Sequence, residues 1–399
     1  MVVSTKERVV PENIVHGRKN LSMLDRVYQN NKESDYTERM EQAKDSYTYE
    51  ANRNHYWLDP EFSLLYGSPL WEQSSPHQKL ALNHLYWICF YNYSIGGEIT
   101  TMMYNQLTCG AFFHLGGYET LCCELDVETL QERIHVECFR VVGHETEKEI
   151  LGKTIFSRPL PSYLDAALVH AQSKERSFVQ KLPFMVNSVL IGQSPFLSTQ
   201  YYVLRGLRNI QLKVKEYQHL LYGKELEKKG EFVPHPTQIS HYHCLDEGFH
   251  TATSKFISHD LYKDFAAPSR FELKVANFGV NRVQQTVKTL SGAVPGIFAD
   301  DEAYMPLIYD MLQTPLFGMS ANEALTMMEK CFCQEHEGFQ VAAKYHHRAY
   351  TQNLEYLEGI DYLSPENREL KVMGQASVEQ TLKNNIAAFQ KFRKTAAVN

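Results

Sequence analysis

The sequence lacks the cysteine pattern of a structural zinc protein. Its eight cysteines include no Cys-x-x-Cys pair, the spacing that such zinc sites commonly use. Scattered cysteines of this kind are typical of reduced, buried thiols in a cytoplasmic protein. An excess of basic residues is also missing, because the formal net charge is −7. We therefore expect no nucleic-acid partner.

Long apolar runs are scarce as well. The most apolar stretch, residues 80–103, contains His84, Asn92 and Glu98, which predicts a buried core helix and argues against a membrane span. Residues 1–54 are polar and charged, without the apolar core of a signal peptide. We expect a cytoplasmic protein that does not contact a membrane.

Alternating strand patterns are rare, and no internal repeat is present. Helical periodicity begins near His77 and continues over residues 119–148, 198–229, 237–263 and 320–353, with breaks at prolines 159, 161, 183, 234, 236 and 295. The pattern predicts one all-α domain over residues 61–354. A charged, partly helical lead-in (1–60) precedes it, and a polar helical tail (355–399) follows.

The most informative motif lies at residues 241–250, His-Tyr-His-Cys-Leu-Asp-Glu-Gly-Phe-His. On a helix, His243, Glu247 and His250 are spaced i, i+4 and i+7, so their side chains share one face. Two imidazoles and a carboxylate on one face predict a metal site.

A second Glu-x-x-His motif, Glu132 to His135, lies upstream. Two such motifs, with one further Glu from each of two other helices, form the ligand set of a ferritin-like di-iron bundle. Glu98, in the most apolar helix, is one candidate for these lone carboxylates. Glu216 is the other, and its rivals on the same predicted helix are Glu225 and Glu227.

The order of these residues resembles the p-aminobenzoate N-oxygenase family of non-heme di-iron enzymes over roughly residues 60–330. The resemblance implies two iron ions, O2 as co-substrate and seven metal ligands: Glu98, Glu132, His135, Glu216, His243, Glu247 and His250. The chain is also similar to the dimetal-carboxylate halogenases of cyanobacterial pathways, which act on unactivated carbons of fatty acyl chains held on a carrier protein.

Two departures count against p-aminobenzoate itself as substrate. Gly97 precedes the first ligand Glu, where the resemblance leads us to expect Thr. The family's later helices are expected to carry an Arg for the aryl carboxylate, yet no Arg lies between Arg282 and Arg348.

Residues around the motifs have less defined roles. Asp246 is expected to orient a ligand imidazole through its free ring nitrogen, and His241 is either a similar outer residue or solvated. His144, His219 and His259 are interpreted as ordinary histidines. Helical spacing places Ile95 and Met102 in a substrate pocket beside Glu98, together with residues of the 119–148 helix.

Three functions remain open at this stage. The first is an O2-activating di-iron oxygenase that hydroxylates or N-oxygenates a mostly apolar small molecule in natural-product biosynthesis. The second is a halogenase of unactivated C–H bonds, with halide as co-substrate and an acyl carrier protein as partner. The third is a non-catalytic metal-binding bundle. The electron donor is unidentified, and a homodimer is the candidate assembly.

Overall fold

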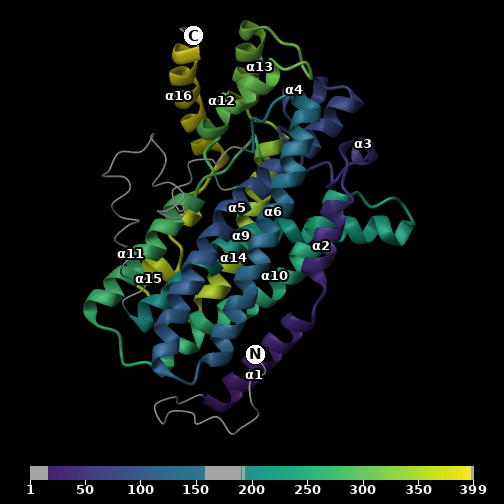
Figure 1. Ribbon diagram of the computed structural model, residues 1–399. Coiled ribbons are helices and arrows are strands. Elements are labelled where there is room, and N and C mark those ends of the chain that lie inside the picture. The colour runs from purple at the N-terminus through teal and green to yellow at the C-terminus, as the bar shows by residue number, and fades with distance from the viewer. Residues whose placement is uncertain (1–16, 158–189, 191–193, 298, 397–399) are drawn as a thin grey trace.

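The computed structural model describes residues 17–157, 190, 194–297 and 299–396 (Figure 1). These residues form helices and loops, with no strand among them, so the all-α prediction is confirmed. The helices are α1 (Gly17–Glu33), α2 (Tyr36–Asp45), α3 (Tyr49–Asn52), α4 (Pro69–Gln73), α5 (Pro76–Leu115), α6 (Glu119–Leu151), α9 (Pro195–Lys229), α10 (His235–His259), η1 (Leu261–Asp264), α11 (Arg270–Val287), α12 (Asp301–Leu312), α13 (Ala321–Cys333), α14 (Glu337–Leu357), α15 (Pro365–Arg368), η2 (Met373–Gln375) and α16 (Val378–Ala396).

Four long helices, α5, α6, α9 and α10, form the central bundle (Figure 1). A short loop joins α5 to α6, and another joins α9 to α10, which favours antiparallel packing within each pair. Outside the bundle, α11 and α14 pack against α9. Side chains that point inward from the four helices therefore meet along one axis.

Local sequence signals determine where these helices start and stop. Ser75 and Gln78 form a reciprocal capping box at the start of α5, and Ser194 caps the start of α9. These side chains pair with backbone N–H groups that lack an intrahelical partner. Gly152 and Gly230 end α6 and α9 with positive φ angles of 70° and 68°, a conformation that glycine adopts without steric cost.

Several helix boundaries differ from the sequence prediction by one to four residues, and one predicted helix is divided. The 237–263 helix ends at His259 and is followed by a short 3-10 turn, η1. The expected 320–353 helix is two helices, α13 and α14, because His336 starts a new one by accepting the N–H of Gly338 at 3.2 Å. The predicted breaks at prolines 159, 161 and 183 lie outside the described residues.

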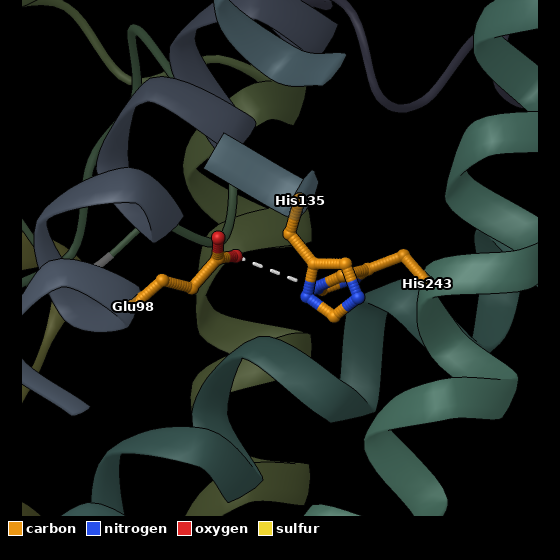
Figure 2. A group of neighbouring side chains, drawn as sticks. All are labelled: Glu98, His135 and His243. Atoms are coloured by element: carbon orange, nitrogen blue, oxygen red, sulfur yellow. Dashed lines mark ion pairs between the residues drawn. The ribbon is translucent and has the colours of Figure 1, made fainter. Parts of the chain in front are cut away.

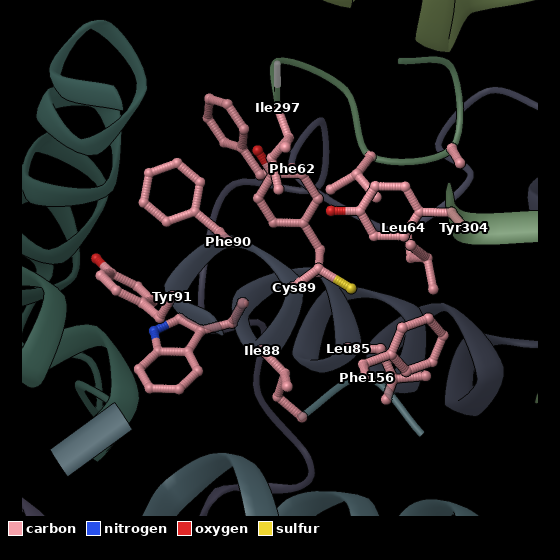
Figure 3. Close-up of a cluster of buried hydrophobic side chains, with 14 of the residues drawn as sticks. Phe62, Leu64, Leu85, Ile88, Cys89, Phe90, Tyr91, Phe156, Ile297 and Tyr304 are labelled. Atoms are coloured by element: carbon pink, nitrogen blue, oxygen red, sulfur yellow. The ribbon is translucent and has the colours of Figure 1, made fainter. Parts of the chain in front are cut away.

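The largest hydrophobic core surrounds the first half of α5. Figure 3 shows Leu85, Ile88 and Phe90 of this helix beside Phe62, from the segment that precedes it, and Tyr304 of α12. Burying each large apolar side chain stabilises the fold by about 1.5–3 kcal/mol. This packing anchors α5, whose second half carries Glu98.

The described residues of both terminal segments are part of the packed structure. Helices α1 and α2 lie against α6 and α10, and α16 lies against α12 and α13. The lead-in, from Gly17 onward, is thus in contact with two helices of the bundle. Among the described residues, no helix combines the length and apolar character that a membrane span requires.

Candidate metal centre

Each bundle helix brings at least one of the seven predicted ligands to the interior. Glu98 comes from α5, Glu132 and His135 from α6, Glu216 from α9, and the remaining three from α10. All seven side chains are buried. The structure therefore gathers residues that are up to 152 positions apart (98 to 250) into one polar cluster inside an apolar bundle.

Glu98, His135 and His243 converge at one end of this cluster (Figure 2). One ligand atom of each lies within 4.8 Å of the corresponding atoms of the other two. Glu98 Oε1 is 3.3 Å from His243 Nε2. This arrangement of a carboxylate and two imidazoles is suited to one metal ion.

Glu132 links this end to the rest of the cluster. It groups with His135 and Glu247 and also with Glu128 and His250, again with ligand atoms within 4.8 Å. His250 Nδ1 is 2.9 Å from Glu247 Oε1 and 3.5 Å from Glu132 Oε1. Carboxylates shared between neighbouring groups are what a dimetal centre requires.

In both His135 and His250, a hydrogen bond to a residue outside the ligand set determines which ring nitrogen faces the cluster. His135 Nε2 donates to Asp246 Oδ2 at 2.9 Å, and His250 Nε2 donates to Gln131 Oε1 at 2.9 Å. Gln131 Nε2 also donates to Asp246 Oδ1 at 2.9 Å. With Nε2 protonated, each ring keeps the lone pair of Nδ1 for a metal.

Several buried polar atoms of the cluster have no hydrogen-bond partner among the described residues. They are both carboxylate oxygens of Glu98, Glu132 Oε2, His135 Nδ1 and His243 Nε2. Two pairs of these atoms, Glu98 Oε1 with His243 Nε2 and Glu132 Oε2 with His135 Nδ1, are close enough for ion pairs, at 3.3 and 3.5 Å, but not in hydrogen-bond geometry. Such atoms are costly to bury, and here they converge, so a cation between them would satisfy the whole group. Two metal ions therefore fit the residues present.

Charge interactions in the cluster are strong. Burial opposes ionisation of Glu216, but the charges of His243 and Lys213 outweigh it and lower the pKa of this carboxyl to about 2. Burial also lowers the pKa of His243, yet Glu216 and Glu98 raise it to about 9. The pKa of Glu98 is raised, chiefly by burial. Without metal, protons and lysine thus balance part of the carboxylate charge.

Of the three carboxylates considered on α9, only Glu216 points into the bundle. It contacts His243 Nδ1 and accepts a hydrogen bond from Tyr91 at 3.3 Å. Glu225 is 51% exposed and pairs with Lys229, and Glu227 is exposed.

The sequence analysis missed a buried ion pair beside the cluster. Arg205 of α9 contacts Glu128 and lies 3.2 Å from Glu132 Oε1. Two spacings in the sequence indicate this ion pair. Glu128 and Glu132 are four residues apart, and Arg205 precedes Glu216 by eleven residues, or about three helical turns. Both spacings place side chains on one helix face.

The N-terminal helices supply a second group that sequence reasoning missed. Asn31 of α1 donates to Glu124 at 2.9 Å and exchanges hydrogen bonds with Gln131, and Thr37 donates to Asp246 at 3.0 Å. No local pattern could have indicated these contacts, since they join residues 93 to 209 positions apart.

We expect Gln131→Leu to lower metal affinity by about 10- to 100-fold, as losses of outer partners typically do. The change removes the hydrogen bonds that orient His250 and Asp246. Affinity is measured by competition with a chelator. Gln106→Leu, at an exposed site on α5, is the control, and equal affinity in both variants would contradict the orienting role.

The other four histidines named from the sequence form no hydrogen bond or ion pair with the predicted ligands among the described residues. His241 is half-buried and forms no hydrogen bond or ion pair with the seven predicted ligands in the described part of the chain. His144 is exposed, and His259 contacts the carbonyl of Tyr356 at 2.6 Å. His219 is buried against Phe62 and Phe90, and burial lowers its pKa to about 3.

A cavity of about 140 Å³ adjoins the candidate metal centre and is lined by residues of α5, α9 and α11, with a few from α6 and α10. Its inner wall includes Glu98, Glu216 and Glu247, whereas its outer wall includes Phe278, which is 59% exposed, and the exposed Arg282. The cavity therefore leads from the carboxylates toward the surface. A Cβ atom on Gly97 would meet no atom within 4 Å, so this glycine leaves room beside Glu98.

The predicted pocket lining needs correction. Ile95 belongs to the main hydrophobic core and Met102 packs against it. Neither lines the cavity, which is faced by Ser94 and Thr101, one position earlier in each case. The expected contribution of the 119–148 helix is limited to Glu132 of α6, and most of the other lining residues come from α9 and α11. A different face of α5 therefore lines the cavity.

Comparison with known proteins adds independent information. Neither the curated proteins nor the solved structures include a match to this chain. A protein-family model does match, over residues 19–188 and 176–393. The match includes all seven predicted ligands and supports the halogenase side of the resemblance, whereas the N-oxygenase side stays a prediction. The chain belongs to the family described as CylC-like acyl halogenases.

Proposed function

We propose that the protein is a dimetal-carboxylate halogenase that replaces hydrogen on an unactivated carbon of an acyl chain with chlorine or bromine. The observation that carries this proposal is the cavity that leads directly onto Glu98, Glu216 and Glu247, in a chain of the acyl halogenase family. The balanced reaction is R–H + X⁻ + O2 + 2 e⁻ + 3 H⁺ → R–X + 2 H2O. An external reductant supplies the two electrons.

The seven predicted ligands would hold two irons, which would supply O2 activation and the oxidising power for breaking a C–H bond. The chain itself positions the substrate. Phe90, Leu204 and Leu212 give the cavity apolar walls, and Phe278 stands at its outer end. An acyl chain entering past Phe278 would place one carbon beside Glu98, with water excluded by the surrounding side chains.

The substrate enters from the exposed side of the cavity, so a carrier protein could present the chain there without entering the bundle. The group that links the acyl chain to the carrier protein would remain near Arg208 and Arg282, which line the outer part of the cavity. An acyl carrier protein is therefore the proposed partner.

A second function, oxygenation of an apolar substrate, is favoured by one observation. All four predicted carboxylate ligands are present and buried at the cluster. A halogenase that makes room for halide by losing a carboxylate ligand would lack one of them. The two functions share the metal centre and differ in whether halide enters the product.

Changing the halide in the reaction buffer distinguishes the halogenase from the oxygenase. Iron-loaded protein, a chemical reductant, O2 and a saturated fatty acyl chain on an acyl carrier protein are incubated in chloride, bromide or halide-free buffer. We expect chlorinated product in the first, brominated product in the second and no product in the third, identified by mass and isotope pattern. A hydroxylated product formed equally in all three buffers would establish the oxygenase instead.

A further inference from the structure

A lysine stands among the predicted metal ligands at the wall of the cavity. Lys213 of α9 lies 2.6 Å from Glu216 Oε2 and 3.4 Å from Glu247 Oε2 through its Nζ atom. The Lys213 side chain is 22% exposed to solvent, and it lines the same cavity as Glu98 and His243. An ammonium group is thus present where halide and substrate would meet.

The nearby Arg205 differs from Lys213 in one respect. Arg205 contacts Glu128, which is not among the seven predicted ligands. Its other partner, Glu132, is a predicted ligand, but Glu128 would still balance the charge of Arg205 when the seven predicted ligands hold metal. Lys213, by contrast, has ion pairs only with Glu216 and Glu247 among the described residues, and both are predicted ligands.

Metal binding would therefore change the surroundings of Lys213 more than those of Arg205. Two divalent ions bound to Glu216 and Glu247 would neutralise much of the negative charge of these carboxylates. The positive charge of the Lys213 ammonium group, in a mostly buried site, would then be less well compensated. An under-compensated charge in such surroundings is costly. A small anion in the cavity would restore the balance.

We propose that Lys213 forms a halide site in the cavity wall, next to the metal centre, when metals are bound. An ammonium group is a compact charge with three N–H donors, and it suits a spherical anion better than a planar one. The proposal rests on the halogenase function and explains how halide can bind although all four carboxylate ligands are retained.

Bromide binding tests this site without turnover. Bromide is titrated into iron-loaded, reduced, oxygen-free protein and followed by calorimetry and by broadening of the bromide NMR signal. Removing a charged hydrogen-bond donor should weaken binding by about 10- to 100-fold, so we expect this loss in Lys213→Met. Lys213→Arg, which keeps the charge, should retain most of the affinity.

Lys224→Met is the matched control, because Lys224 lies on the same helix with its side chain exposed. Iron content is measured for every sample, and Lys213→Gln replaces the methionine variant if that variant fails to load iron. Unchanged bromide affinity in an iron-loaded neutral variant would overturn the halide site and leave the halogenase function standing. No bromide binding by the unmodified protein, together with halide-independent product, would overturn both.

Discussion

Glu247→Ala is expected to leave at least one of the two metal positions empty and to abolish activity. Glu247 is central to the cluster: its Oε1 atom is 2.9 Å from His250 Nδ1 and 3.9 Å from His243 Nε2. It also groups with Glu132 and His135. Removing the carboxylate takes an oxygen donor from this group, and the measurement is iron content per chain after reconstitution.

Two controls accompany this variant. His241→Ala changes a histidine on the same helix that forms no hydrogen bond or ion pair with the predicted ligands in the part of the chain that the structure describes, and it should retain most of the iron. Glu216→Ala should lose iron, whereas Glu225→Ala should not, because Glu225 lies at the surface. Full iron occupancy in Glu247→Ala would be incompatible with the assigned ligand set.

Arg205→Leu is expected to lower the unfolding free energy of the metal-free protein by about 3–5 kcal/mol. The guanidinium group is buried and pairs with Glu128 and Glu132, which are also buried. Without it, two carboxylates remain inside the bundle with less compensating charge. Urea unfolding of metal-free protein measures the change.

The double variant Arg205→Leu, Glu128→Leu tests whether the lost stability comes from the unpaired carboxylate charge or from the lost packing of the arginine side chain. It removes one uncompensated carboxylate and should recover part of the stability. Arg140→Leu, at an exposed position on α6, should have little effect. An unfolding midpoint for Arg205→Leu equal to that of Arg140→Leu would show that the buried pair does not stabilise the bundle.

Much of the bundle could be predicted because its signals are local. Ser75 and Gly230 mark helix ends through backbone rules that operate within a few residues. Five of the predicted ligands were selected by spacings within single helices, such as Glu132 with His135. Glu98 and Glu216 were selected as the lone carboxylates that the di-iron ligand pattern requires, and the structure places all seven in one cluster. Helical periodicity is sufficient to assign residues to a face.

The features that escaped prediction depend on packing between distant elements. Thr37 reaches Asp246 across 209 positions, and no pattern within α2 indicates that contact. The cavity wall depends on how α9 and α11 lie against α5, so Ser94 faces it where Ile95 was expected. Lys213 looked like one of many lysines on α9 until the structure placed it between two buried carboxylates.

Metal content of the unmodified protein tests the central claim most directly. The protein is produced with iron, and the iron bound per chain is measured before and after it is reduced and exposed to O2. The dimetal centre predicts about two irons per chain and O2 consumption by the reduced protein. One iron or none per chain, with no O2 consumption, would contradict the dimetal centre and favour a structural role for the buried cluster.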